Sequence, residues 1–305
     1  MLGTCPYRAL PLGAASAAAE PPINRNQFKP EQPTAVSPHP YSSNSGPPRG
    51  EARLRGGTTL DNALGLLRAD AAWEPAVARL RELKQSGGAQ AEAAAADYVG
   101  VYAGRRGAMI IDVVASRQRS YGKRVRPMVA AWVAAHQEPT ITALAENRLD
   151  AAQYGLSEAE VETIATAAQR FREFGEAEGL AATAEAEGLA ATADEDQLCL
   201  RWAERYGPFE HAPRLDPVVG SVKGIGLALW SYMRMRSGAN TLKVDVRVRK
   251  ALKQLGFSVP HDSDHAVLII AKAAAEEAGL PLLVLDQLLW SAQELHQIIS
   301  EGEIA

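Results

Sequence analysis

From residue 58 onward, apolar residues recur three and four positions apart, which is the spacing of one face of an α-helix. Leu60, Leu64 and Leu67 begin this pattern, and it continues almost to the C-terminal end. No run alternates apolar and polar residues as a half-buried β-strand does. The spacing therefore predicts an all-α fold.

Local signals support the expected helices. Pro75 suits the first turn of a helix, because its missing N–H would have no partner there. Ser157 and Glu160 have the spacing of a capping box, in which each side chain bonds the other residue's backbone N–H. After two helices around Leu60 and Pro75, we expect further helices at residues 109–115, 125–135, 141–149, 157–174, 196–206, 217–222, 227–236, 244–255, 263–278 and 282–299.

Two segments depart from this pattern. Ten of the 18 prolines lie in the first 50 residues, among Ser, Asn and Gly. Such a segment cannot bury enough apolar surface to offset its ordering entropy, so we expect residues 1–57 to be a disordered tail before a folded domain at 58–305. The nine residues EAEGLAATA occur twice in succession, which is too short for a solenoid unit. We expect residues 176–195 to be a low-complexity insertion.

Charge is unevenly distributed along the chain. The total is 32 basic and 36 acidic residues, a net charge of −4 that does not by itself favour nucleic acid. Residues 101–130 nevertheless hold seven basic side chains against one acidic, and residues 201–260 hold eleven against four. Either stretch alone is typical of a solvated helix face. Two such stretches beside one motif favour a surface that binds a polyanion.

Two further observations exclude whole classes of protein. Cys5 and Cys199 are the two cysteines, so the chain cannot hold an iron–sulfur cluster or a four-cysteine zinc site. No segment has the ~18 consecutive apolar residues of a membrane-spanning helix. We therefore expect a protein of the cytoplasm, without a membrane partner.

The most informative segment runs from residue 218 to residue 256. Gly224, Ile225 and Gly226 form a tight turn between two expected helices, where the glycines let the chain reverse around a buried Ile225. Backbone N–H groups after such a turn point outward at a helix N-terminus and suit an anion, and Lys223 adds a positive charge. A simple helical hairpin without a ligand is the commoner explanation of a lone Gly-x-Gly.

Val244-Asp245-Val246-Arg247-Val248 follows the turn, and the combination resembles the helix-hairpin-helix DNA glycosylases of the endonuclease III superfamily. In that family the hairpin is followed by an aspartate within a V-D-x-x-V context. Residues 111–118, which end in Ser-Arg-Gln, resemble the helix and Ser-x-Gln turn that open the family's fold. Residues 140–174 and 285–290 resemble later helices, so the resemblance covers roughly residues 60–300. It implies two helical subdomains with a DNA-binding cleft between them.

The resemblance implies that Asp245 is the catalytic carboxylate. A glycosylase develops positive charge on deoxyribose in its transition state, and a carboxylate beside the anomeric carbon stabilises that charge and positions water. The alternative is that Asp245 caps the following helix, and both roles are compatible. Bifunctional relatives carry a lysine two residues after the second hairpin glycine, where this chain has Ala228. The expectation is thus a monofunctional enzyme without lyase activity.

Further binding residues come from the same resemblance. Gln118 matches the residue that fills the gap left by a flipped nucleotide, although a surface glutamine in a turn explains it nearly as well. Arg117, Arg119 and Lys123 would contact phosphates or the orphaned base, or simply solvate the turn. Arg247 belongs to the same expected DNA-contacting set, but Val246-Arg247 stands where the family usually has Thr-His. Four aromatic residues could line a base pocket, although helical spacing favours the core for all of them: Trp230, Tyr232, Phe257 and Trp290.

The resemblance implies a base-excision protein that acts on double-stranded DNA; we expect it to be a monomer and, in a bacterium, to be associated with the nucleoid. No redox or metal cofactor is expected, although relatives often hold a monovalent cation at the hairpin carbonyls. Two alternatives stay open: a catalytically inactive DNA-binding member of the family, and a helical scaffold with ordinary solvated basic faces.

Overall fold

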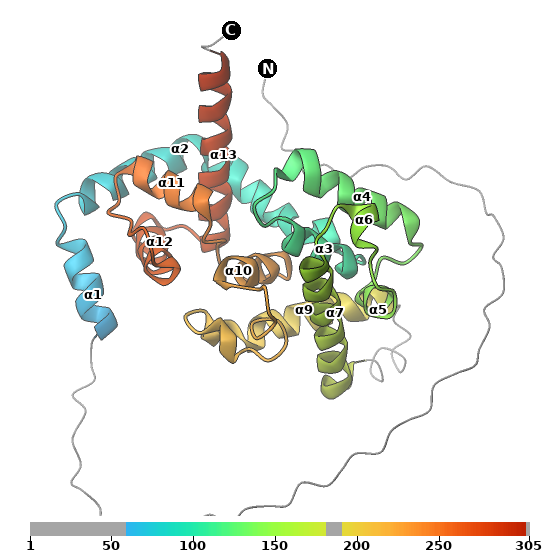
Figure 1. Ribbon diagram of the computed structural model, residues 1–305. Coiled ribbons are helices and arrows are strands. Elements are labelled where there is room, and N and C mark those ends of the chain that lie inside the picture. The colour runs from blue at the N-terminus through green and yellow to red at the C-terminus, as the bar shows by residue number, and fades with distance from the viewer. Residues whose placement is uncertain (1–58, 181–190, 303–305) are drawn as a thin grey trace, which may run out of the picture.

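A computed structural model describes residues 59–180 and 191–302. Within these ranges the chain forms twelve α-helices and no β-strand, which confirms the all-α prediction (Figure 1). No helix in the described ranges has the length and apolar character needed to cross a membrane. The expected tail at 1–57 lies outside the described residues.

Most helices lie where the apolar spacing predicts them. Residues 227–236 form a helix with both expected ends, and Ser157 and Glu160 form the predicted capping box. The α-helices are α1 (Thr59–Arg68), α2 (Trp73–Tyr98), α3 (Arg106–Ala115), α4 (Arg126–Ala135), α5 (Ile141–Glu146), α6 (Ala151–Tyr154), α7 (Glu158–Glu178), α9 (Ala191–Arg205), α10 (Leu227–Arg236), α11 (Val246–Leu255), α12 (Asp264–Ala278) and α13 (Leu282–Gly302). Short 3-10 helices η1 (Gly100–Tyr102), η3 (Gly207–Phe209) and η4 (Pro213–Leu215) and a π-helix η2 (Tyr121–Val125) complete the list.

The structure differs from the prediction at three places. The helix expected at 141–149 is shorter than predicted: α5 ends at Glu146, and a separate short helix, α6, begins at Ala151, where the Asp150 side chain caps it. The helix expected at 217–222 is wrong: these residues form turns held by the buried Asp216 carboxylate, which accepts from the N–H groups of Val218 and Gly220. Of the expected insertion at 176–195, residues 181–190 lie outside the described residues, and the flanking parts belong to α7 and α9.

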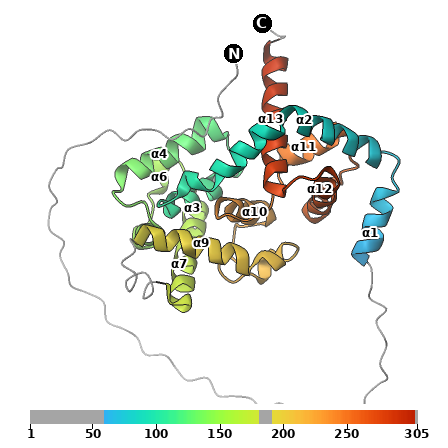
Figure 2. The same ribbon diagram turned by 180° about the vertical axis from the view of Figure 1, so that it is seen from behind.

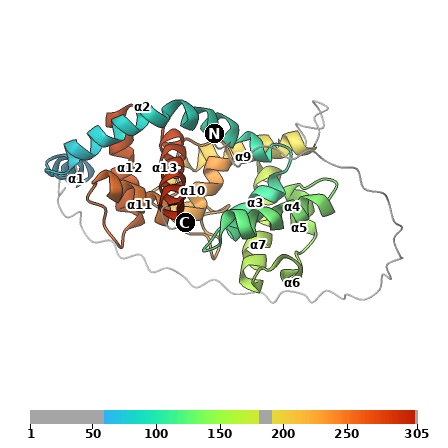
Figure 3. The same cartoon turned by 90° about the horizontal axis from the view of Figure 1, so that it is seen from above.

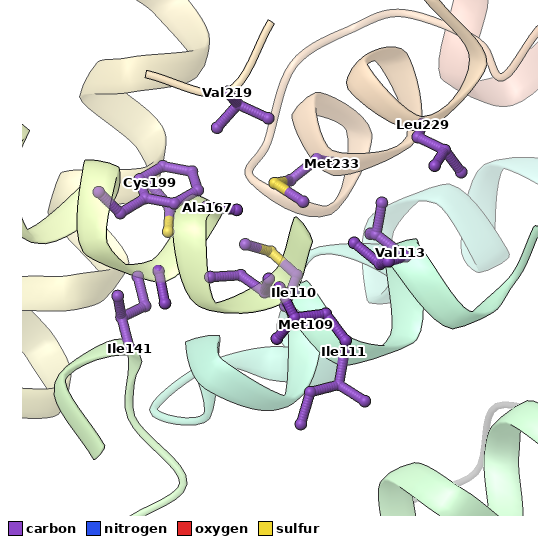
Figure 4. Close-up of a cluster of buried hydrophobic side chains, with 14 of the residues drawn as sticks. Met109, Ile110, Ile111, Val113, Ile141, Ala167, Cys199, Val219, Leu229 and Met233 are labelled. Atoms are coloured by element: carbon purple, nitrogen blue, oxygen red, sulfur yellow. The ribbon is translucent and has the colours of Figure 1, made fainter. Parts of the chain in front are cut away.

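The buried apolar residues form two separate cores. The first core lies among α3, α7, α9 and α10, where Met109, Ile110 and Met233 pack together (Figure 4). Figure 2 shows α9 running along this group below α3 and α10. The second core joins α2, from Trp73 as far as Ala95, to α11, α12 and α13, with Leu80 and Leu285 fully buried. α2 extends along both groups (Figure 3), so Trp73 belongs to the second core and Tyr98 to the first.

Several arginines of the basic stretches point inward. Arg236 is fully buried: its guanidinium donates to the Tyr98 carbonyl at 3.1 Å and to the Tyr232 hydroxyl at 3.2 Å. Tyr232 in turn donates to Asp112 Oδ2 at 2.7 Å. Arg106 and Arg234 are also buried. Part of the local positive charge therefore stabilises the fold rather than facing a partner.

Candidate functional site

A small pocket lies where the two cores meet, and we call it the inner pocket. Its volume is about 90 Å³. Both helix groups contribute to its wall, together with the loop after α3 and the segment that leads into α11. The lining residues are Tyr98, Ser116, Arg119, Tyr121, Tyr232, Lys243, Asp245, Arg247, Val248, Asp286, Gln287 and Trp290.

A wider, more open groove of about 690 Å³ borders the inner pocket, and we call it the outer groove. The glycine turn and the loop 116–119 both contribute to its wall. The two cavities share Ser116, Arg119, Lys243, Asp245 and Arg247. Asp245 thus stands at the boundary between an enclosed pocket and a surface groove.

Asp245 is held by the start of α11. Its Oδ1 accepts from the backbone N–H of Arg247 at 2.9 Å and of Val248 at 3.1 Å, which is N-cap geometry. Asp245 therefore caps α11 through Oδ1, as the alternative interpretation of the sequence predicts. The other oxygen, Oδ2, takes no part in the cap and faces the Lys243 amine at 3.8 Å. The Asp245 side chain is 25% exposed and lines both cavities.

Lys243 enters the inner pocket from the segment before α11. Its Nζ donates to Ser116 Oγ at 3.2 Å and lies 4.3 Å from the centroid of the Tyr232 ring. Burial lowers the pKa of the Lys243 amine, and the carboxylates of Asp245, Asp112 and Asp286 partly oppose this effect. The side chain is 18% exposed, and it lines both the inner pocket and the outer groove.

Asp286 is a second carboxyl group in this pocket, carried by α13. Its Oδ1 accepts from the Lys243 backbone N–H at 3.0 Å, and its Oδ2 accepts from the Gln287 amide at 3.1 Å. Burial is the largest effect on this group and raises the pKa of Asp286 to about 7. The pocket thus contains two carboxyl groups in different environments, one capped and partly exposed and one buried.

Arg247 and Trp290 close the inner pocket on one side. The guanidinium lies 3.8 Å from the centroid of the indole ring, which is cation–π geometry. Val246, the other residue that departs from the family's usual Thr-His, is 80% exposed. Arg247 therefore lines both cavities beside Asp245, whereas Val246 lines the outer groove and not the inner pocket.

The glycine turn has the conformation expected of it. Gly224 has a φ of 93°, and a Cβ there would lie 2.6 Å from Thr163 Oγ1. Ile225 is buried, as predicted, and Gly226 is the N-cap of α10 with no side-chain cap on its N–H groups. Lys223 is exposed beside the turn. The first arm of the hairpin consists of turns rather than an α-helix.

The carbonyl groups of this turn face protein donors. The Arg214 guanidinium donates, at 3.3, 3.4 and 3.1 Å, to the carbonyls of Gly220, Ser221 and Val222. The next two carbonyls, of Lys223 and Gly224, accept from Thr163 and Arg117. A bound cation would need several of these oxygens to converge on it, and a guanidinium already supplies positive charge there. The residues therefore do not fit the hairpin cation that the resemblance implies.

The loop after α3 reaches the same groove. Gln118 is exposed and has a φ of 56°, which is a strained conformation for a residue other than glycine. Arg117 donates to the Gly224 carbonyl at 3.3 Å and so ties this loop to the glycine turn. The resemblance assigns the loop after α3 and the glycine turn to one site, although they lie far apart in the sequence. In the structure these two elements are in contact.

Two of the residues expected to bind phosphate are not placed for that role. Arg119 pairs with the Glu160 carboxylate through both terminal nitrogens, and this contact is the largest cause that lowers the pKa of Glu160 to about 2. Its charge is therefore compensated within the fold. Lys123 is exposed on η2 and lines neither the inner pocket nor the outer groove.

The aromatic candidates divide into two kinds. Trp230 and Phe257 are core residues, as helical spacing indicates. Tyr232 and Trp290 line the inner pocket. The sequence reasoning missed Lys243 and the role of Asp286 in this pocket; a carboxylate within the apolar run of α13 was the available signal for Asp286.

Comparison of the chain with protein-family models, with curated proteins and with solved structures finds no match. The chemistry of the site therefore follows from its own residues. An oxygen of Asp245, an amine and a second carboxyl group meet in one pocket, and this pocket adjoins a groove with a glycine turn and a strained loop on its wall.

Proposed function

We propose that this protein is a base-excision protein similar to DNA glycosylases, which hydrolyses the N-glycosidic bond of a base flipped out of double-stranded DNA. The position of Asp245 carries the proposal. A carboxylate oxygen outside the helix cap, at the boundary between an enclosed pocket and an open groove, suits a nucleotide whose base enters the pocket while its backbone stays in the groove.

Hydrolysis of a glycosidic bond would give Asp245 and the inner pocket separate roles. Asp245 Oδ2 would stabilise the positive charge that develops on the sugar and would position the attacking water. In the inner pocket, Trp290 and the buried Asp286 offer the base a flat apolar face and a hydrogen-bonding group. The hairpin offers no amine to the sugar, since Ala228 stands at that position. We assign base release itself to water as the nucleophile, positioned by Asp245.

The outer groove would hold the DNA backbone. The N–H groups at the start of α10 have no side-chain cap, and such groups bind phosphate oxygens. Among the described residues, neither Arg117 nor Arg247 has a carboxylate within salt-bridge distance, so both charges are available to phosphates. Gln118 would enter the gap in the duplex, where a fixed backbone conformation favours a defined position of the side chain.

One observation favours a second candidate, a DNA-binding protein without base release. Arg247 lies against the Trp290 ring, on which a flipped base would stack. If Arg247 keeps this position when DNA binds, the protein would recognise a distorted or abasic site without accepting a base.

A base-release assay tests the proposal. Duplexes with uracil, alkylated purines, oxidised guanine or adenine mispairs are incubated with wild type and with Asp245→Asn, and alkali then cleaves any abasic site. We expect wild type to release one class of base and Asp245→Asn to release it at least about 100-fold more slowly, the usual effect of such a group. Asparagine also caps helices, so α11 should keep its cap.

Asp150→Asn is the matched control for this variant. Asp150 caps α6 through the same two N–H positions as Asp245 does in α11, and it lines neither cavity. Equal activity of the two variants would contradict a catalytic Asp245. Absence of base release by wild type, together with tight binding of an abasic-site analogue, would select the second candidate. Absence of duplex binding at low salt would exclude both.

A further inference from the structure

The amine of Lys243 is placed beside the proposed reacting carboxylate by the fold itself. Leu242 and Val244, on either side of it, are buried in the second core. The Lys243 backbone N–H is fixed by Asp286 Oδ1 at 3.0 Å, while the side chain crosses to Ser116 of the loop after α3. The Ser116 hydroxyl donates to the Val113 carbonyl at 2.8 Å, so its oxygen is left to accept from Lys243.

From this geometry we infer that Lys243 is the nucleophile of a lyase step, which cleaves the DNA strand at the abasic site left by base release. The inference rests on the proposed function for the origin of the abasic site. The inference departs from the expectation, based on Ala228, that the protein has no lyase activity. That expectation considers only the lysine position in the hairpin. Lys243 reaches the same cavity from the segment before α11.

The position of the amine suits attack on the sugar carbon that Asp245 would face. Nζ lies 3.8 Å from Asp245 Oδ2, so a sugar held against this oxygen is within reach of the amine. An amine attacks a carbonyl carbon only in its neutral form. Burial lowers the pKa of Lys243 and so increases the neutral fraction. An exposed lysine gains no such activation.

The step balances without an oxidant or a further co-reactant. The abasic sugar opens to an aldehyde, and the Lys243 lone pair forms a bond to C1′. The aldehyde oxygen leaves as water, taking one proton from the amine and one from solvent, while the nitrogen keeps its other proton. In the resulting protonated imine, the Asp245 carboxylate takes a proton from C2′. The electron pair of that C–H bond forms a double bond between C2′ and C3′, and the C3′–O bond breaks as the downstream strand leaves with a 5′-phosphate. Water then hydrolyses the imine, which frees the amine and an unsaturated aldehyde at the 3′ end.

Imine trapping tests this assignment separately from base release. The substrate is a duplex with a preformed abasic site, made from a uracil-containing duplex by an independent uracil glycosylase, and sodium borohydride reduces any imine to a stable amine. We expect wild type to form a covalent protein–DNA adduct and mass spectrometry of its peptides to place the adduct at Lys243. We also expect strand cleavage in the absence of borohydride.

Two substitutions separate the chemical role from a structural one. Lys243→Arg keeps the positive charge but has no nucleophilic amine near neutral pH, and Lys243→Gln removes both. We expect both variants to lose adduct formation at least about 100-fold, as for removal of a positioned catalytic group. Lys253→Gln changes an exposed lysine at the other end of α11 and should match wild type. Circular dichroism melting of each variant verifies that it is folded.

Three outcomes would overturn the inference: no adduct with wild type, an adduct mapped to another lysine or to the chain's α-amino group, or an adduct of normal yield with Lys243→Arg. If the adduct forms at Lys243 while no damaged base is released from any duplex, the lyase inference stands and the proposed glycosylase is wrong. If bases are released and no adduct forms, the glycosylase stands and the lyase inference is wrong.

Discussion

Asp286 is a carboxyl group within an apolar helix, and its burial makes the stability of the protein depend on pH. Its pKa is raised to about 7 in the folded protein, against the ordinary value near 3.8 in the unfolded chain. Between these two values the folded state binds the proton and the unfolded state does not. The free energy of unfolding should therefore fall as the pH rises from about 4 to about 7, by roughly 4 kcal/mol at most.

Asp286→Asn should remove this dependence. Asparagine carries no charge at any pH, so the variant should lose less stability than wild type between pH 5 and pH 8. Urea unfolding at these two pH values gives the measurement. Asp97→Asn, at an exposed position of α2, should keep the wild-type dependence. An equal pH dependence of wild type and Asp286→Asn would show that Asp286 is ionised in the folded protein throughout this range.

The residues of the inner pocket show which part of a site a single sequence reveals. Asp245 was predictable because a local motif carries it: an acid before an apolar helix, at a fixed spacing from a glycine turn. Lys243, Tyr98 and Asp286 were not, because each belongs to a different element and no local pattern says which helix faces meet. Gln118 was located correctly in a turn, but only the structure shows its positive φ.

At the scale of the element, the glycine turn before α10 supports the most direct stability prediction. Gly224→Ala would force a side chain into a left-handed conformation and place its Cβ 2.6 Å from Thr163 Oγ1. That hydroxyl is itself held in place, since its one hydrogen is shared between the carbonyls of Ala159 at 2.7 Å and Lys223 at 3.0 Å. We expect a loss of about 1–3 kcal/mol in the free energy of unfolding, which urea titration measures.

Gly226→Ala is the matched control two residues away. Gly226 has an extended backbone, and an added Cβ would meet nothing within 4 Å. Its substitution should cost less than about 1 kcal/mol, as expected of a poorer N-cap residue. If both variants lost the same free energy of unfolding, neither the left-handed conformation nor the contact with Thr163 would restrict which residue can occupy position 224.

The helices that the sequence predicts correctly differ from the one that it predicts wrongly in what determines their conformation. α10 and α12 were predicted closely because apolar spacing and local caps determine them. The expected helix at 217–222 was wrong because a long-range arrangement competes with helix formation there. The Asp216 carboxylate binds the N–H groups, and an added Cβ at Gly220 would lie 1.7 Å from the Pro213 carbonyl oxygen. Apolar spacing contains no information about such contacts.

At the scale of the whole molecule, the packing of the two cores limits which basic residues could contact the DNA that we propose as partner. The buried arginines of the basic stretches cannot meet DNA, and Arg119 is neutralised by Glu160. The charge that remains at the outer groove includes Arg117 and Arg247, which come from opposite sides of the junction between the cores. DNA in this groove would therefore contact both helix groups.

The salt dependence of duplex binding tests this arrangement. Each phosphate neutralised by the protein should contribute about 0.9 to the slope of log K against log salt concentration. Arg117→Gln and Arg247→Gln should each lower the magnitude of this slope by about that amount, and the double variant by about twice as much. Arg170→Gln serves as the control, because Arg170 pairs with Glu173 on α7 and lines neither cavity. Fluorescence anisotropy of a labelled duplex at several salt concentrations gives the slopes; equal slopes for the double variant and Arg170→Gln would place the DNA on another face of the molecule.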